Sequence, residues 1–232
     1  MVEIKSLASD SSGNAHFITD KYSPLLLDVG IPWKLIQRGL NFKTSELAGI
    51  LISHAHADHC KGVKDAIKSG IDCYMSQATA DAIGVVGHRV KIIQAKRQFK
   101  LGPWTVLPFG VEHDVETYGY LLVNQNGARV LYLTDTAYCR YRFKNLTHIL
   151  LEVNHSLDIL RANVDAGIIS ADLKNRIIKT HMGLDTAKEF LKANDLSRVE
   201  SIHLIHLSND NSDAERFKKE VMELTGKPTY IA

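Results

Sequence analysis

The distribution of hydrophobic and polar positions divides this chain into many short elements. Apolar runs of strand length, each bounded by turn residues, predict strands at 2–8, 16–19, 25–28, 50–53, 73–75, 105–109, 118–123, 130–134, 148–153 and 201–205. Apolar residues at helical spacing predict helices at 33–40, 62–68, 79–83, 186–193 and 213–224. The opening half therefore consists mostly of strands, and helices enter between the strands afterwards.

The segment 213–224 carries helix signals at both of its ends. Phe217, Val221 and Leu224 fall on one helical face. Ser212 and Asp213 are residue types that cap helix N-termini, and Gly226 followed by Pro228 is typical of the stretch just beyond a helix C-terminus. We therefore expect an amphipathic helix that packs through this face and ends before Gly226.

Strands and helices mixed in this way indicate a layered structure. We expect an α/β fold (αββα) in which two packed mixed β-sheets are flanked by helices. No Pro-, Gly- or Ser-rich linker divides the 232 residues, so the pattern predicts a single domain over residues 1–232.

The composition is that of an ordinary globular protein, with 45% hydrophobic and 23% charged residues. A net charge of +2 is too small to indicate nucleic-acid binding by itself. The three cysteines show no zinc-knuckle or disulfide spacing, which favours a reducing, cytoplasmic setting. The apolar runs are too short to span a membrane, and the first residues do not resemble a secretion signal. The 11 histidines are the unusual feature, because several of them are clustered.

One histidine cluster follows a predicted strand and precedes the predicted helix at 62–68. His54 and His56 alternate with alanines, so both side chains can face one point in an extended turn. Asp58 and His59 come at the helix entry, where they can face a second, nearby point. Imidazole and carboxylate groups suit zinc, and short His-rich tracts are a recognised metal signature. The alternative is a polar loop with chance histidines.

Further metal-binding residue types stand at the ends of later strands. His113 follows the strand at 105–109, Asp135 follows the strand at 130–134, and His206 follows the strand at 201–205. Strand ends present functional groups in layered α/β folds. Each of these histidines alone would more often be a hydrogen-bonded surface residue. Together with the first cluster they supply the missing ligands of a two-metal site.

The order of these residues resembles the metallo-β-lactamase superfamily over nearly the whole chain. His54-Ala55-His56-Ala57-Asp58-His59 matches the HxHxDH motif of that superfamily in full. The resemblance implies two zinc ions, with manganese as an alternative, and a ligand set of His54, His56, Asp58, His59, His113, Asp135 and His206. By the same resemblance Asp135 bridges the two ions. Asp28 does not bind an ion itself but supports the residues that do.

Other segments resemble one branch of this superfamily, the YycJ/WalJ-like proteins. Residues 9–14 (SDSSGN) are similar to their SGSSGN opening, with Asp10 where Gly is usual. Residues 151–155 (LEVNH) are similar to their ESNH segment, and residues 181–183 (HMG) to their HLS segment. Phage-encoded anti-Pycsar phosphodiesterases belong to the same neighbourhood, and the tRNA-processing nuclease RNase Z is a more distant relative.

The resemblance to RNase Z implies a catalytic pair, because its Glu and His after the fourth motif match Glu152 and His181. Such a pair delivers a proton to the leaving alkoxide, since a neighbouring carboxylate favours the histidinium. The resemblance also implies catalytic roles for Asp58 and Asp135, which would position the nucleophile as metal ligands. Without the resemblance, His181 would be a surface histidine near a helix start, and Glu152 a partner in a strand-end salt bridge.

Residues 158–179 are the predicted specificity element. Arg161, Lys174, Arg176 and Lys179 are spaced among apolar residues, so the segment could fold over the site as a lid and contact phosphate. An ordinary solvated helix pair is an equal alternative.

These observations predict a zinc-dependent phosphodiesterase that hydrolyses P–O bonds of nucleotides. The modest charge favours 3′,5′-cyclic mononucleotides, as in anti-Pycsar immune evasion, over the alternative of a YycJ-type DNA or RNA nuclease. A thioester or lactone hydrolase is a further alternative, and a non-enzymatic metal protein is disfavoured by the intact ligand set. The relatives imply a homodimer. The expected location is the cytoplasm (of the host, if the chain is phage-encoded), with no membrane partner.

Overall fold

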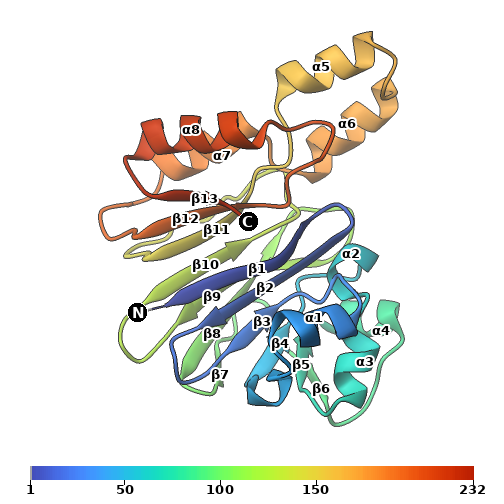
Figure 1. Ribbon diagram of the computed structural model, residues 1–232, viewed down its shortest axis with the longest axis vertical. Helices are drawn as coiled ribbons and strands as arrows, with labels where there is room; N and C mark the ends of the chain where they lie inside the picture. Colours follow the sequence, from blue (N-terminus) through green and yellow to red (C-terminus); the bar gives the residue numbers. More distant parts are fainter. Residues whose placement is uncertain (1) are drawn as a thin grey trace. The chain divides into compact units, whose positions relative to one another are not determined.

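The computed structural model describes residues 2–232, which divide into two compact units (Figure 1). Unit 1 runs up to Gly110 and includes Val115–Ala128, and unit 2 consists of Val111–Asp114 and Arg129–Ala232. Each unit combines strands with helices, and the candidate site residues divide between the two units. The single domain expected for residues 1–232 stays a prediction.

Unit 1 contains a six-stranded sheet in the order β1-β2-β3-β4-β5-β6. Its strands are β1 (Glu3–Asp10), β2 (Gly13–Thr19), β3 (Leu25–Leu27), β4 (Gly49–Leu51), β5 (Cys73–Met75) and β6 (Val90–Ile92). β1 to β3 are antiparallel and β3 to β6 are parallel. Parallel neighbours need crossover connections. These contain α1 (Trp33–Gly39), η1 (Thr44–Glu46), α2 (Ala57–Cys60), α3 (Val63–Lys68) and α4 (Gln77–Ile83).

A second layer of unit 1 consists of β7 (Phe99–Leu101), β8 (Trp104–Val111) and β9 (Thr117–Val123), in the order β9-β8-β7. The Tyr120 hydroxyl donates to the Ile52 carbonyl at 2.6 Å, and the Trp104 indole donates to the Ser23 carbonyl at 2.9 Å. Both aromatic side chains are fully buried, so each joins the two layers by apolar contact and a satisfied hydrogen bond. A second buried cluster, around Trp33, joins the six-stranded sheet to its helices.

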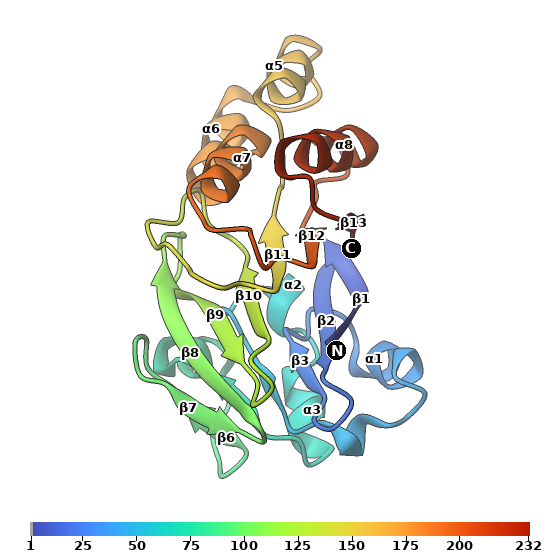
Figure 2. The same cartoon turned by 90° about the vertical axis from the view of Figure 1, so that its left-hand side faces the viewer.

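Unit 2 contains a parallel sheet in the order β13-β12-β11-β10. Its strands are β10 (Arg129–Leu133), β11 (His148–Glu152), β12 (Ser201–Ile205) and β13 (Thr229–Ile231). β11 is buried along its whole length, as expected of a parallel strand covered on both faces. α7 (Leu184–Lys192) and α8 (Ala214–Thr225) lie side by side on this sheet. α5 (Leu157–Asp165) and α6 (Ala171–Thr180) project beyond it (Figure 2).

The predicted ends of the last helix are confirmed. The Asp213 side chain accepts a hydrogen bond from the Arg216 amide, and Gly226 ends α8 with a φ of 65°. Phe217 and Val221 are fully buried on the face that the sequence predicted. The left-handed conformation of Gly226 explains why glycine ends this helix.

The structure differs from the sequence pattern mainly in short elements. β6, β7 and β13 were not predicted, because each mixes polar with apolar residues and is only partly buried, unlike the equally short but fully buried β3 and β4. α3 confirms the helix predicted at 62–68, whereas α2, a single turn over Ala57–Cys60, was not predicted. This single turn is polar and has no apolar repeat, although its backbone is helical.

Residues 158–179 form most of α5 and most of α6, in agreement with the helix-pair alternative. Whether they act as a lid stays a prediction. Among residues 2–232, none of the helices has the length and apolar content needed to cross a membrane.

Candidate metal centre

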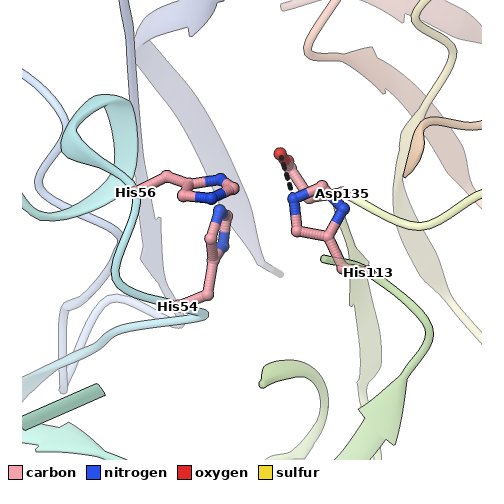
Figure 3. A group of neighbouring side chains, drawn as sticks. All are labelled: His54, His56, His113 and Asp135. Atoms are coloured by element: carbon pink, nitrogen blue, oxygen red, sulfur yellow. Dashed lines mark ion pairs between the residues drawn. The ribbon is translucent and has the colours of Figure 1, made fainter. Parts of the chain in front are cut away.

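The HxHxDH segment lies in unit 1 between β4 and α2. His56 is extended and stands at the N-cap of α2, which places Asp58 and His59 in the first helical turn. The His54 and His56 rings meet edge to face with centroids 4.7 Å apart (Figure 3). The centroids of the His54 and His59 rings lie 4.3 Å apart. The strand-to-helix turn therefore gathers the imidazoles of the motif into one cluster.

Asp28 holds one of the two ring nitrogens of His59. The His59 Nδ1 donates to the Asp28 Oδ2 at 2.7 Å, and both side chains are fully buried. Ser53 donates to the same carboxylate through its amide at 2.7 Å and through its hydroxyl at 2.8 Å. Because Nδ1 is occupied, Nε2 is the nitrogen of His59 that can bind a metal. This atom lies 3.4 Å from the Asp58 Oδ2.

Asn14 and Gly30, to which the sequence analysis gave no role in the site, pack directly on this cluster. Asn14 is fully buried, and its Nδ2 lies 3.2 Å from the His59 Nε2. A Cβ on Gly30 would lie 1.6 Å from the Asp58 carbonyl oxygen. Any side chain on Gly30 would therefore displace the backbone of Asp58. The family-like SDSSGN segment could have pointed to a role for Asn14 in the site. A single glycine such as Gly30 has no sequence feature that indicates such a role.

Unit 2 gathers Asp135, Glu152, His181 and His206, each with one ligand atom within 4.8 Å of the others. The His206 Nε2 lies 3.7 Å from the Asp135 Oδ1, and the His206 Nδ1 lies 3.4 Å from the Glu152 Oε1. The His181 and His206 rings are stacked with centroids 5.3 Å apart. Both carboxylates are buried, and buried carboxylates require positive partners.

His113 lies beside Asp135 in the same unit. Its Nε2 is 3.7 Å from the Asp135 Oδ2, the ion pair drawn in Figure 3. Its Nδ1 donates to the Thr180 carbonyl at 2.9 Å, which fixes the ring and directs Nε2 toward Asp135. Burial lowers the pKa of His113, although Asp135 opposes this effect. The neutral imidazole, which is the form that binds metals, is therefore favoured.

Three site residues have a left-handed backbone. The φ angles of Asp28, Asp135 and His206 are 59°, 45° and 54°. This conformation costs non-glycine residues about 1–3 kcal/mol, although Asp and His tolerate it better than most. Each residue stands within two positions of a strand end, so the same turn that ends the strand directs the side chain. A sequence pattern does not reveal such a φ angle.

Glu152 and His181 form a tight pair, in which the His181 Nδ1 donates to the Glu152 Oε1 at 2.6 Å. Burial alone would lower the pKa of His181, but the charge and hydrogen bond of Glu152 raise it above its ordinary value. Burial alone would raise the pKa of Glu152, but His181 reverses the shift and lowers it. Both shifts favour a histidinium beside a carboxylate. The Thr136 and Met182 amides donate to the other oxygen, Oε2, at 2.9 and 3.2 Å.

The donor atoms of both units suit divalent metal ions. Each unit presents imidazoles together with a carboxylate, from Asp58 in unit 1 and from Asp135 in unit 2. This combination is typical of zinc and related transition metals. The structure gathers His54, His56, Asp58 and His59 within unit 1, and His113, Asp135, Glu152, His181 and His206 within unit 2. The individual roles of these residues stay predictions.

Comparison with known proteins identifies the family. A model of a β-lactamase superfamily domain matches residues 32–207. The chain is 32% identical to the exodeoxyribonuclease WalJ of Streptococcus pneumoniae over 226 residues, which cover 90% of this chain and 82% of that protein. The metallo-β-lactamase fold protein YhfI of Bacillus subtilis is structurally similar, with a TM-score of 0.74, 15% identity, and coverage of 100% of this chain and 97% of that one. The short form of human tRNase Z gives a TM-score of 0.66, with 15% identity and coverage of 100% and 96%.

The fold is α/β, with two mixed β-sheets flanked by helices, and the predicted metallo-β-lactamase fold is confirmed. The chain belongs to the β-lactamase superfamily. The predictions of a hydrolase with candidate metal ligands and of a relationship to WalJ-like proteins are likewise confirmed. The relationship to anti-Pycsar enzymes stays a prediction.

Proposed function

We propose that the chain is a metal-dependent phosphodiesterase that hydrolyses DNA from a chain end. The observation that carries the proposal is the buried Glu152–His181 pair beside Asp135. Cleavage of a phosphodiester releases an alkoxide that needs a proton, and this pair can supply it. A thiolate leaving group needs no such donor, which disfavours the thioester hydrolase alternative. The similarity to the exodeoxyribonuclease WalJ over 90% of the chain supports DNA as the substrate.

The proposed ligand set follows from the HxHxDH motif and from the metal-binding residue types at later strand ends. One zinc ion would be held by His54, His56 and His113, the other by Asp58, His59 and His206, and both by Asp135, with manganese as the alternative metal. Such a pair of ions supplies, when bound, polarisation of the phosphoryl oxygens and a nucleophile at neutral pH.

The residues of the chain would orient the ligands and move one proton. Asp28 fixes the ring of His59, so that this ligand keeps one tautomer. Glu152 fixes His181 through Nδ1, which leaves the protonated Nε2 to donate to the departing alkoxide. Glu152 remains ionised because amides and His181 surround it. After donation, His181 recovers a proton from solvent, since its side chain is 21% exposed.

A 3′,5′-cyclic mononucleotide is the second candidate substrate. The net charge of +2 favours it, because a nuclease that follows a DNA strand benefits from a stronger basic track. For either substrate, the proposal includes the homodimer and the cytoplasmic location expected from the sequence analysis.

The test is a hydrolysis panel with the zinc-loaded and the manganese-loaded protein. The panel contains single- and double-stranded DNA labelled at either end, RNA, the 3′,5′-cyclic forms of CMP, UMP, AMP and GMP, and a glutathione thioester. Asp58→Ala removes a proposed ligand. Asp65→Ala is the matched control, because Asp65 is an exposed acid on the following helix.

We expect stepwise release of mononucleotides from DNA that is abolished by Asp58→Ala and unchanged by Asp65→Ala. If only the cyclic nucleotides are hydrolysed, the substrate is a 3′,5′-cyclic mononucleotide and not DNA. Turnover of the thioester alone would overturn the phosphodiesterase proposal, as would activity that survives Asp58→Ala.

A further inference from the structure

Ser53 lies in unit 1 among three residues of the candidate site, although the predicted ligand set gives it no role. Its hydroxyl oxygen is 2.8 Å from the Asp28 Oδ2, 3.0 Å from the His54 Nδ1 and 3.3 Å from the His59 Nδ1. All four residues are buried, with at most 1% of each exposed. The hydroxyl must therefore divide its one hydrogen and its two lone pairs among these neighbours.

The fold brings Ser53 beside Asp28 because the two residues follow neighbouring parallel strands. β3 and β4 pair with Leu27 opposite Leu51, so their carboxyl ends meet at one edge of the sheet. The Ser53 amide donates to the Asp28 Oδ1 at 2.7 Å, which holds the backbone of Ser53 against the carboxylate. The hydroxyl of the same residue then reaches the second carboxylate oxygen, Oδ2.

The carboxylate determines which of these groups donate and which accept. An ionised carboxylate only accepts hydrogen bonds, so the Ser53 hydroxyl and the His59 Nδ1 both donate to Asp28. The His59 Nδ1 lies closer to Oδ2, at 2.7 Å, than to the serine oxygen, at 3.3 Å, and its hydrogen therefore goes to the carboxylate.

The same count of hydrogens fixes the tautomer of His54. Ser53 has no second hydrogen to donate, so its oxygen accepts the hydrogen bond from the His54 Nδ1. In the neutral ring, which is the form that binds metals, His54 therefore carries its proton on Nδ1 and its lone pair on Nε2.

Two neighbouring candidate ligands thus depend on one buried carboxylate. Asp28 holds His59 directly and His54 through the Ser53 hydroxyl, and the two ring centroids are only 4.3 Å apart. The group bonded to the second nitrogen of a metal-binding histidine sets the tautomer and orientation of the ring, and with them the metal affinity. In the ligand set proposed above, His54 and His59 bind different ions.

We infer that Ser53 is a positioning residue that extends the action of Asp28 from His59 to His54, so that one carboxylate orients a ligand of each proposed ion. The inference rests on the ligand set of the proposed function and adds a residue that the HxHxDH motif does not contain. It requires Ser53 and Asp28 to act as one unit, in contrast to two independent contacts.

The test follows the ring nitrogens of the zinc-loaded full chain by long-range ¹H–¹⁵N correlation spectra with ¹⁵N-labelled histidine. We expect both His54 and His59 to show zinc on Nε2 and a hydrogen-bonded proton on Nδ1. Ser53→Ala should shift the His54 Nδ1 proton upfield, because its acceptor is lost, and leave the His59 proton in place, because Asp28 still holds it. Ser76→Ala is the matched control, since Ser76 is a buried serine of the same unit whose hydroxyl caps α4.

Zinc affinity, measured by competition with a chelator, provides the second readout. Ser53→Ala should weaken zinc binding about 10-fold, as expected of a group that orients a metal ligand, and Ser76→Ala should not change it. In the Asp28→Asn background, Ser53→Ala should cost less than about 3-fold, because contacts that act as one unit are not additive. An equal loss in both backgrounds would mean that Ser53 acts independently of Asp28 and would overturn the inference.

The spectra also separate the inference from the proposed function. A proton on the His54 Nε2 in the wild-type protein would overturn the inference, and so would an unchanged His54 signal in Ser53→Ala. The wild-type spectrum decides the tautomer by itself, so the test stands even if Ser53→Ala does not fold. The expected spectra in a protein that hydrolyses no phosphodiester would overturn the proposed function and leave the role of Ser53. Hydrolysis of DNA with an unchanged His54 signal would overturn the role of Ser53 alone.

Discussion

The two units hold their candidate ligands by different means. In unit 1, His59 is paired with one buried carboxylate, Asp28, which Ser53 also contacts through two hydrogen bonds. In unit 2, one buried carboxylate, Glu152, lies near two histidines, His181 at 2.6 Å and His206 at 3.4 Å. A carboxylate that hydrogen-bonds to a single imidazole fixes the tautomer and the orientation of that ring. A carboxylate near two imidazoles can change which of them it stabilises.

The difference supports the proposed roles, which are orientation of a ligand in unit 1 and proton movement in unit 2. The Asp28–His59 contact is fully buried on both sides, so water cannot exchange a proton there. The His181 side chain is 21% exposed while Glu152 is fully buried, so His181 can exchange protons with solvent. The mutations below separate these two tasks.

Among the variants that separate these two tasks, His181→Ala should have the largest effect on catalysis and little effect on metal content. Loss of a general acid costs about 10²- to 10⁴-fold in rate, or roughly 3–5 kcal/mol of barrier. The measurement is kcat on DNA together with metal content by elemental analysis, with His88→Ala as the control because His88 is an exposed histidine of unit 1.

A substrate whose leaving group needs no proton tests the proton-donor role of His181 more directly than DNA does. The activity of His181→Ala on an aryl phosphodiester such as bis(p-nitrophenyl) phosphate should fall less than about 10-fold, because nitrophenolate leaves unprotonated. A fall in metal content would contradict the proton-donor role and make His181 a ligand, as its place beside Asp135 and His206 allows.

Asp28→Asn should weaken metal binding without changing the chemistry. Partners that orient a metal ligand typically contribute about 10- to 100-fold in affinity, or roughly 1–3 kcal/mol. Competition with a chelator at neutral pH measures this change. Asp20→Asn is the control, since Asp20 is another buried carboxylate of unit 1 that accepts hydrogen bonds from the Tyr22 and Ser23 amides. Equal zinc affinity in wild type and Asp28→Asn would show that Asp28 does not orient His59.

The two groups of candidate site residues also differ in how well the sequence predicts them. The candidate ligands of unit 1 lie within six consecutive residues, so their spacing alone predicted the cluster. The site residues of unit 2 come from the ends of separate elements, and only the resemblance to a family linked Glu152 with His181. Neither source revealed the left-handed backbone of Asp135 or the close approach of Gly30 to Asp58, because both depend on tertiary contacts. The strands β6, β7 and β13 were missed because their polar and apolar residues form no continuous apolar run, unlike those of the equally short β3.

Acid should destabilise unit 2 through three buried or half-buried histidines that are neutral in the folded state. Burial lowers the pKa of His203 to about 4, while its ring stacks on Tyr230 and contacts Ser201. A histidine with a lowered folded-state pKa stabilises the protein above its ordinary pKa of 6.5. This contribution is lost as the pH falls from 6.5 to about 4. Burial also lowers the pKa values of His148 and His155, so all three act in the same direction.

Urea unfolding at pH 7.5, 6.0, 5.0 and 4.0 measures this effect. His203→Gln should reduce the loss of stability between pH 6.5 and 4 by on the order of 1–2 kcal/mol, because it removes one group that takes up a proton on unfolding. Identical pH dependence in wild type and His203→Gln would show that His203 is protonated equally in both states.

The ion pair between α5 and α8 should have the smallest effect. Arg216 donates to Asp158 at 2.5 Å, and this hydrogen bond is the main reason that the pKa of Asp158 falls to about 2. The Asp158 side chain is 61% exposed, so solvent screens the pair and Asp158→Asn should cost at most about 1 kcal/mol. A carboxyl with a lowered folded-state pKa stabilises the protein above 3.8, and the contribution disappears as the pH falls toward 2. The effect should be local, because the pair ties the projecting α5 to the body of unit 2. Hydrogen exchange should therefore accelerate in α5 and remain unchanged in β11, whereas uniform acceleration would mean that α5 and the sheet open together.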